Sequence, residues 1–258
     1  ELARLTESFN EMLKSLQESR ERQSQLVADA GHELKTPLTS LRTNIELLMM
    51  ASKNPSDTIT PDDIADLEHD VMSQLEELTN LVTDLVDLAR EDSQHSVVEP
   101  IDLGEILDGV IDRVRRRRLD IKFTFNLIDW YLMGDQRGLS RAFLNVLDNA
   151  AKWSPENGTV TMTMQQIDDD RVEITVDDEG PGIPADEREL VFERFYRSVE
   201  SRAMPGSGLG LAIVKQVMES HGGSVRAEES PRGGTRMVLE LPGGPQITSN
   251  NNEAMRIS

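Results

Sequence analysis

The chain of 258 residues contains no cysteine, which excludes disulfide bonds and thiolate metal sites and fits a reducing compartment. Basic residues are also few: 27 lysines and arginines stand against 47 aspartates and glutamates, a net charge of -20. So acidic a chain has little attraction for nucleic acid or for anionic lipid, and neither is an expected partner. No apolar run reaches the roughly 20 residues needed to cross a bilayer, and no signal peptide is visible.

The N-terminal part has the pattern of long helices. Apolar residues three and four apart, from Leu5 to Leu16 and again from Leu26 to Leu48, describe a coiled-coil seam. Asn54 and Pro61 break this pattern, and a second amphipathic helix is expected from Asp62 to Arg90. Two such helices form an antiparallel hairpin. Each leaves an apolar stripe too exposed for a monomer, so we expect a homodimer that forms a four-helix bundle.

The pattern changes after residues 93–100, which are polar, end in proline and indicate a linker. Helical and strand-like segments then alternate, which predicts an α/β sandwich with helices on one side of a sheet. Residues 243–258 lack periodicity and are predicted to be disordered. The sequence begins at Glu1 inside a helical pattern, so we expect it to be part of a longer protein. We expect helices at 103–117, 139–151 and 211–221, and strands at 121–125, 130–133, 159–165, 171–177, 224–228 and 235–241.

His32 is the candidate nucleophile of the helical part. It lies two residues from the seam position Ala30, about 200° around the helix, and therefore points away from the bundle core. A neutral imidazole offers a ring lone pair, and Glu33 can hold the other ring N–H and make that nitrogen more basic. Pro37 removes an N–H, so a kink is expected beside the histidine. A solvated polar pair is the alternative; a metalloprotease helix is excluded because position 36 is Thr36 rather than a second histidine.

Asn145 and Asn149 lie four residues apart and share one face of a predicted helix. A buried asparagine pair is costly unless it binds something, whereas Mg²⁺ needs only one or two protein ligands when water and phosphate complete its shell. We assign the metal to Asn149. Lys152 is placed to meet a phosphate, and Trp153 either offers a face to an adenine ring or packs in the core.

The sequence Asp178-Glu179-Gly180-Pro181-Gly182 follows a predicted strand. Asp178 can accept a hydrogen bond from an exocyclic amine, and Gly180 and Gly182 let the chain turn close to a base. A long irregular segment follows, from Ile183 to Pro205, and is interpreted as a lid.

Gly206, Gly208 and Gly210 precede the next predicted helix, so free backbone amides and the positive helix end would face phosphates. A single Gly-x-Gly is a weak signal, but the three segments in this order are a strong one. The basic run from Arg115 to Arg118 is interpreted as a solvated helix end rather than an anion-binding patch.

Together these motifs resemble the cytoplasmic core of a bacterial sensor histidine kinase. The resemblance implies a multidomain α and α+β fold: residues 1–19 as the end of a HAMP-type linker, 20–92 as the dimerisation and histidine phosphotransfer domain, and 101–242 as a Bergerat-type ATP-binding domain. The matching segments are the H box Ala30 to Leu38, the N box Asn145 to Lys152, the first glycine box Asp178 to Gly182, the F box Phe192 to Phe195 and the second glycine box Gly206 to Gly210.

The resemblance also implies a chemistry. ATP and Mg²⁺ would bind in the second domain, His32 would take the γ-phosphoryl group with Glu33 as base, and an aspartate of a response regulator would receive it. Thr36 resembles the residue that orients water for dephosphorylating that regulator. Arg194 in the F box and Leu209 in the second glycine box are further implied nucleotide-side residues. Membrane contact would come only through missing N-terminal segments, so the full-length protein is expected at the cytoplasmic side of the membrane and the present chain is expected to be soluble.

Two alternatives belong to other classes. ATPases of the gyrase, chaperone and mismatch-repair superfamily hydrolyse ATP with a glutamate four residues before the metal-binding asparagine, but that position is Asn145 here, so water would lack a general base. A catalytically silent scaffold that only relays signals is the other alternative. The presence of all the expected catalytic residues argues against it.

Overall fold

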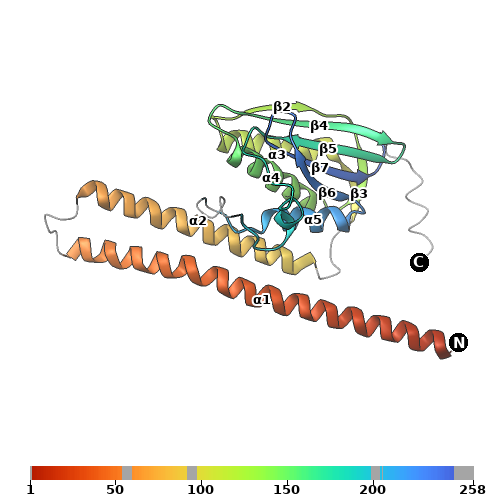
Figure 1. Cartoon of the computed structure of the whole chain (residues 1–258), viewed down its shortest axis with the longest axis horizontal. Helices are drawn as coiled ribbons and strands as arrows, with labels where there is room; N and C mark the ends of the chain where they lie inside the picture. The colour runs from red at the N-terminus through yellow and green to blue at the C-terminus, as the bar shows by residue number, and fades with distance from the viewer. Residues whose placement is uncertain (1, 54–59, 92–97, 199–203, 205, 247–258) are drawn as a thin grey trace. The chain divides into compact units, whose positions relative to one another are not determined.

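The computed structural model describes residues 2–53, 60–91, 98–198, 204 and 206–246 (Figure 1). The chain divides into two compact units, one formed by residues 1–95 with 203–207 and the other by residues 96–202 with 208–258. The first unit is helical and the second contains the sheets, as the sequence predicts.

The helical unit contains two long helices, α1 (Leu2–Lys53) and α2 (Pro61–Glu91). A reciprocal cap starts α2: the Asp63 N–H donates to the Thr60 hydroxyl, while the Thr60 N–H and hydroxyl both donate to Asp63 Oδ2 at 2.8 Å. These two bonds lower the pKa of the Asp63 carboxyl. Pro61 then takes the first helical position, where its missing N–H costs no hydrogen bond.

The two helices pack along part of their apolar stripes. Leu41 and Leu81 are buried, and Gln74 Nε2 donates to Ser40 Oγ across the pair at 2.9 Å. Other residues of the same stripes stay open to solvent: Leu38 is 52% exposed and Val82 is 48% exposed. One hairpin therefore leaves apolar surface uncovered, which is the physical basis of the predicted four-helix bundle.

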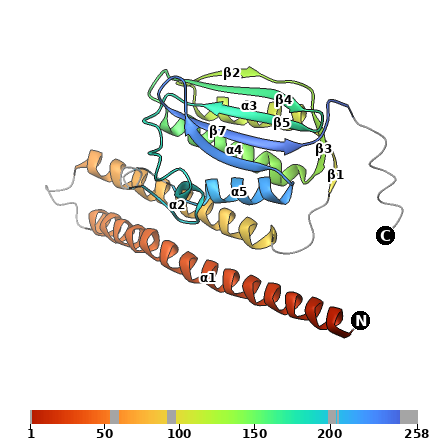
Figure 2. The ribbon, with the colours of Figure 1, turned by 45° about the vertical axis from the view of Figure 1, so that its right-hand side comes forward.

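The second unit is an α/β sandwich. Its five-stranded sheet has the order β2-β4-β5-β7-β6, in which β2 pairs with β4 in parallel and the other neighbours are antiparallel. A small antiparallel pair of β1 and β3 adjoins it. Helices α3, α4 and α5 cover one face of the large sheet (Figure 2). The elements are β1 (Glu99–Asp102), α3 (Leu103–Arg117), β2 (Lys122–Asn126), β3 (Tyr131–Gly134), α4 (Gln136–Trp153), β4 (Thr159–Asp168), β5 (Arg171–Asp177), the 3-10 turn η1 (Leu190–Phe192), α5 (Gly210–Ser220), β6 (Ser224–Glu229) and β7 (Thr235–Pro242).

The core lies between the sheet and the helices. Alternate residues of β5, such as Val172 and Ile174, are fully buried, as are Leu139, Phe143 and Leu147 on one face of α4. Each such side chain contributes about 1.5–3 kcal/mol when it leaves water. This packing holds α4 and its polar edge in a fixed position against the sheet.

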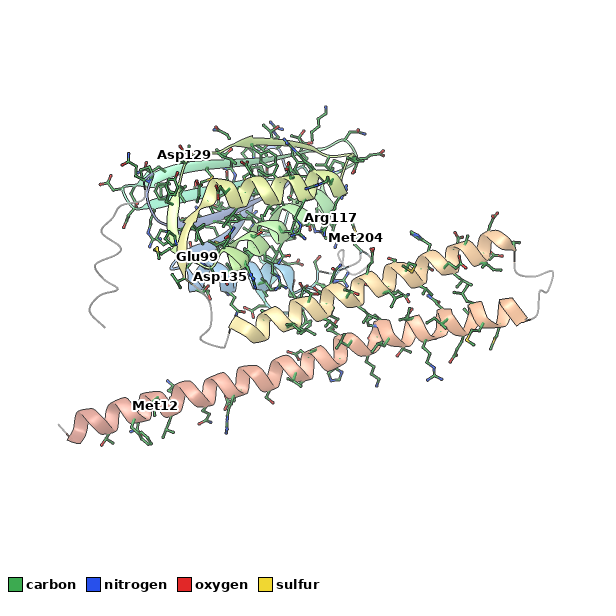
Figure 3. The ribbon with its side chains drawn as sticks, turned by 180° about the vertical axis from the view of Figure 1, so that it is seen from behind. Met12, Glu99, Arg117, Asp129, Asp135 and Met204 are labelled. Carbon is green, nitrogen blue, oxygen red and sulfur yellow. The ribbon has the colours of Figure 1, made fainter. Side chains whose placement is uncertain are left out.

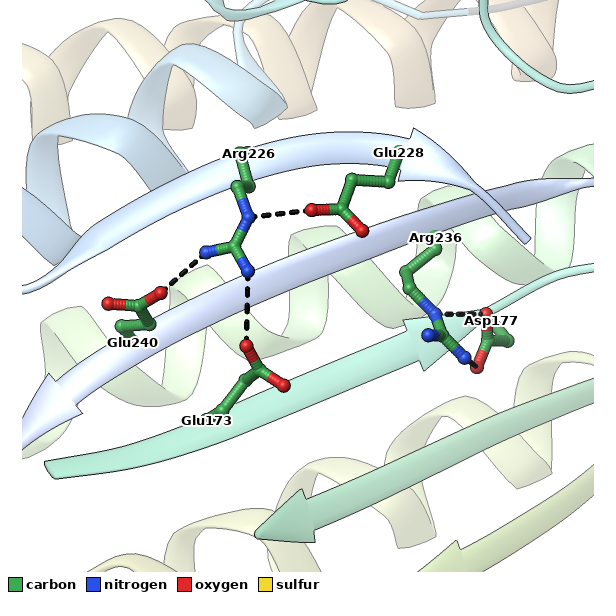
Figure 4. Close-up of polar contacts among 6 residues, drawn as sticks. All are labelled: Glu173, Asp177, Arg226, Glu228, Arg236 and Glu240. Carbon is green, nitrogen blue, oxygen red and sulfur yellow. Dashed lines mark hydrogen bonds and ion pairs between the residues drawn. The ribbon is translucent and has the colours of Figure 1, made fainter. Parts of the chain in front are cut away.

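The opposite face of the sheet carries ion pairs instead of helices (Figure 4). Arg226 on β6 donates to Glu228, Glu240 and Glu173, which lie on three different strands, and these bonds raise the pKa of its guanidinium. Arg236 and Asp177 form a two-bond pair at 2.8 Å. The sheet is therefore apolar on one side and charged on the other, which accounts for the alternation seen in its strands.

Two details differ from the sequence-based predictions. Strand β1 begins at Glu99, inside the segment interpreted as a linker. Gly244, in the segment predicted to be disordered, pairs with Tyr131 through two backbone hydrogen bonds. Both segments supply hydrogen-bond partners to β3, so pairing rather than side-chain periodicity orders them. Residues 247–258 of that segment lie outside the described residues.

Candidate functional site

The predicted phospho-acceptor His32 lies on α1 with its side chain exposed, as do Glu33 and Thr36. The His32 side chain is therefore accessible in the single chain, as the outward orientation predicted from the helical register requires. The helix continues through Pro37. An exposed imidazole can be reached by a phosphoryl donor, whereas a buried imidazole could not.

Helix α4, which carries the N box, is anchored at its start. Asp135, which Figure 3 labels, caps the helix. Its carboxylate accepts the Arg137 N–H and its own N–H donates to His221 Nε2, both at 2.9 Å. Because Nε2 accepts, Nδ1 carries the proton and donates to Val217 O at 2.7 Å. His221 is the C-cap of α5 and also joins that helix to α4.

The N box meets the second glycine box through Asn145. Its Nδ2 donates to the carbonyl of Gly210 at 3.2 Å, although the two residues are 65 positions apart. Gly210 begins α5, so its N-terminal amides lie beside α4. Leu209 next to it is fully buried and holds this junction in the core.

At the other end of the N box, Asn149 Oδ1 accepts a hydrogen bond from Trp153 Nε1 at 3.2 Å. Lys152 Nζ lies 5.4 Å from the centroid of the Trp153 ring, in cation–π contact. Both asparagines and Trp153 are half-buried. Of the two interpretations of Trp153, core packing is therefore disfavoured; Trp130, by contrast, is fully buried.

Asp178 is a buried carboxylate at the end of β5, with 4% of its surface exposed. Its Oδ1 accepts the N–H of Gly180 at 2.9 Å and of Thr235 at 2.8 Å. Burial raises the pKa of the Asp178 carboxyl, against the opposing effect of these two bonds. A carboxylate has about four acceptor positions, so it can hold the turn and still accept from a ligand amine.

Gly234 and Thr235 support Asp178 and were not singled out in the sequence. A Cβ on Gly234 would lie 2.2 Å from the carbonyl oxygen of Asp178, so only glycine fits there. Glu179 accepts the Thr159 N–H at 3.1 Å and pairs with Arg232 at 3.2 Å. The signal was present in the sequence as Gly233-Gly234 between two predicted strands.

The F box and the second glycine box are joined by backbone. The Phe195 N–H donates to the carbonyl of Gly208 at 3.0 Å, and a Cβ on Gly208 would lie 2.9 Å from the Phe195 carbonyl carbon. Gly208 and Gly182 have φ angles of 69° and 80°, which glycine adopts without strain. Arg194 is half-buried.

The basic run at the end of α3 consists of paired side chains. Arg117, which Figure 3 labels, forms an ion pair with Asp148 at 2.9 Å. Arg118 binds Asp120 through two hydrogen bonds. Burial raises the pKa of Asp148, while Arg117 opposes that shift. These arginines are committed to local partners, in agreement with their interpretation as a helix end.

The donor set around the N box fits Mg²⁺ held mostly by a nucleotide. Within the described ranges, no group of three or more histidine, aspartate or glutamate side chains could hold a metal ion. Asn149 offers one neutral oxygen, which suits an ion that keeps water and phosphate oxygens as its remaining ligands.

Two protein families match the chain. Residues 22–94 match the His Kinase A (phospho-acceptor) domain, and residues 134–245 match the histidine kinase-, DNA gyrase B-, and HSP90-like ATPase. The chain belongs to the sensor histidine kinase family and contains the phospho-acceptor and ATP-binding domains of its kinase core.

Within that family, the chain is similar to the mycobacterial protein MprB. The signal transduction histidine-protein kinase/phosphatase MprB of Mycobacterium leprae is 59% identical over 254 residues, which cover 96% of this chain and 49% of that protein. A solved structure of the mycobacterial sensor histidine kinase MprB is 52% identical and has a TM-score of 0.55; the match covers 58% of this chain and all of that one. In the sequence, the segments Val27 to Leu34 and Asn149 to Pro155 resemble those of this mycobacterial sensor kinase.

A structure of full-length ShkA in complex with AMPPNP is 26% identical, with a TM-score of 0.59, and the match covers 86% of this chain and 47% of that one. The chain spans about half the length of the curated relatives it matches. Among its described helices, none has the length and apolar character needed to cross a membrane.

Proposed function

We propose that this chain transfers the γ-phosphoryl group of ATP to His32 and then to an aspartate of a response regulator. The observation that carries the proposal is the bond between Asn145 and the carbonyl of Gly210. This bond joins the N box to the second glycine box, which is distant in sequence. It brings the proposed metal ligand and the N-terminus of α5 to the same edge of the unit, where a phosphate can bind.

The residues of the second unit have separate tasks in this proposal. The Asp178 carboxylate accepts from the adenine amine, Lys152 and the amides of Gly208 and Gly210 contact phosphates, and Asn149 holds Mg²⁺. When bound, the ion neutralises phosphate charge during the transfer.

At His32 the reaction is a displacement at phosphorus. The lone pair of a ring nitrogen forms the N–P bond while the bond from the γ-phosphorus to the bridging oxygen breaks, which leaves ADP. Glu33 holds the other ring N–H and stabilises the positive charge that develops on the imidazole. Positioning of the two reactants supplies most of the rate.

The partners of this core follow from the same chemistry. The uncovered apolar stripes of α1 and α2 support a homodimer. Thr36 lies one turn beyond His32 and is exposed on the same helix, where its hydroxyl can hold a water beside a docked phospho-aspartate. We place the full-length protein at the cytoplasmic side of a membrane, since the relatives are sensor kinases about twice as long.

Direct hydrolysis of ATP is the competing activity. It would need a carboxylate at position 145 to activate water. Asn145 instead donates through Nδ2 to a carbonyl, a bond that a carboxylate cannot make because it has no proton to donate. The hydrogen bonding at this position therefore favours phosphorylation of a side chain over hydrolysis.

Incubation of the chain with Mg²⁺ and γ-labelled ATP distinguishes these activities. The proposal predicts label on the protein that is lost in acid and retained in base. Released phosphate without labelled protein would indicate an ATPase, and neither product would indicate a signalling scaffold.

A further inference from the structure

The last turn of α4 contains a side-chain hydrogen bond that bears on metal binding. Trp153 Nε1 donates to Asn149 Oδ1 at 3.2 Å, and both side chains are half-buried. Residues four apart are neighbours on a helix, so this contact is made within a single rigid element. It does not depend on a loop or on the second glycine box.

The indole N–H determines which end of the carboxamide it meets. An indole can only donate, whereas a carboxamide has an oxygen on one side and an NH₂ group on the other. If the Asn149 amide were turned over, two donors would face each other, so the contact selects the oxygen. The Lys152 ammonium, 5.4 Å from the ring centroid, helps to hold the indole plane in place.

A carboxamide oxygen has two lone pairs, and the indole uses one of them. The other is left for a cation. Mg²⁺ demands near-ideal octahedral geometry and accepts oxygen but not an N–H group, so an asparagine that is free to turn over would bind it less well.

We propose that Trp153 is a positioning residue for Mg²⁺: its indole N–H holds the Asn149 carboxamide with the oxygen in the metal-binding orientation. This inference rests on the role of Asn149 in the proposed function. The role requires the indole N–H and not the aromatic face. Phenylalanine, which has an aromatic face but no hydrogen-bond donor, could not perform it.

The test is the effect of Mg²⁺ on nucleotide affinity. The dissociation constant of AMPPNP is measured by calorimetry with Mg²⁺ and with EDTA. The value in EDTA divided by the value in Mg²⁺ isolates the contribution of the metal to affinity. Stacking of the ring on adenine affects both constants alike and cancels in the ratio. Trp153→Phe should lower the ratio about two- to tenfold, the value of one hydrogen bond.

Two other variants make the test specific. Trp130→Phe is the matched control, since it makes the same chemical change at the buried tryptophan of the same unit, and it should leave the ratio unchanged. Asn149→Asp has an oxygen on both sides and needs no orientation. In that background Trp153→Phe should have no effect on the ratio, which a merely structural role of Trp153 would not predict.

Asn149→Ala distinguishes an error in the role of Trp153 from an error in the assignment of the metal to Asn149. It should abolish the metal contribution, so that the ratio falls close to one. If it does, but Trp153→Phe leaves the ratio unchanged, the positioning role is wrong while the proposed function stands. If Asn149→Ala keeps the full ratio, the metal assignment is wrong and the role of Trp153 is overturned with it.

Discussion

Replacement of Asp178 by asparagine should have opposite effects on stability and on nucleotide binding, because burial of the charged carboxylate costs stability while the same charge binds the adenine amine. The structure predicts that Asp178→Asn folds, because the side-chain oxygen can still accept the N–H groups of Gly180 and Thr235. Burial raises the pKa of the Asp178 carboxyl, so the stability that this group contributes is present below its unfolded pKa of about 3.9 and is lost as the pH rises through the folded-state pKa. Asparagine does not titrate. The free energy of unfolding of the variant should therefore improve relative to the wild type as the pH rises above about 4.

Binding should change in the opposite direction. The asparagine NH₂ group would face the adenine amine, so two donors meet and the charged acceptor is lost. Such a loss costs about 1.5–3 kcal/mol, or about ten- to hundredfold in affinity. ADP should bind more weakly to that extent, whereas IDP, which lacks the amine, should lose much less.

Calorimetry with both nucleotides provides the assay. Asp177→Asn is the matched control, because its carboxylate pairs with Arg236 on the opposite face of the sheet, and it should leave the preference for ADP over IDP unchanged. An equal loss of both nucleotides in Asp178→Asn, or unchanged ADP affinity in a folded protein, would refute the assigned role of Asp178.

Three further predictions concern other parts of the chain. Thr36→Ala should retain most autophosphorylation but lose phosphatase activity toward the phosphorylated regulator; parallel loss of both in the two assays would instead indicate a role in supporting Pro37. Gly234→Ala should weaken ADP binding at least tenfold, because the added Cβ would displace the Asp178 backbone. Gly233→Ala is the control: its Cβ would meet open space, so it should strain the turn through its φ of 94° but affect binding less. Light scattering of the chain at micromolar concentration should give the mass of a dimer, and Leu38→Glu should shift it toward a monomer; a wild-type monomer contradicts the bundle.

Much of the fold was predictable because its strands and helices have one buried face. The alternation of residues 171–177 and the periodicity of residues 103–117 gave element bounds that the structure confirms. The ordered segments at Glu99 and Gly244 were missed because backbone hydrogen bonds hold them in place. Such pairing cannot be predicted from the pattern of side chains. The parallel pairing of β2 with β4 was also not predicted, since it depends on the path of the chain between them.

The candidate site divides in the same way. Asn149 and Asp178 could be selected from the sequence because their spacing and their neighbouring glycines point to a nucleotide. The long-range contacts that build the site could not be predicted, because they join residues that are distant in the sequence: Asn145 with Gly210, and Asp178 with Thr235. The bond from Trp153 to Asn149 is local, yet it depends on a rotamer that the sequence does not specify.

The most direct test of the account is the site of phosphorylation. Wild type and His32→Gln are incubated with Mg²⁺ and γ-labelled ATP, and protein-bound label is measured before and after brief acid treatment. We expect acid-labile label on the wild type and none on His32→Gln. AMPPNP affinity should be equal in the two proteins, because His32 belongs to the helical unit and the proposed nucleotide-binding residues belong to the other. Label that persists on His32→Gln, or wild type that takes up none while it binds nucleotide, would show that His32 is not the phospho-acceptor.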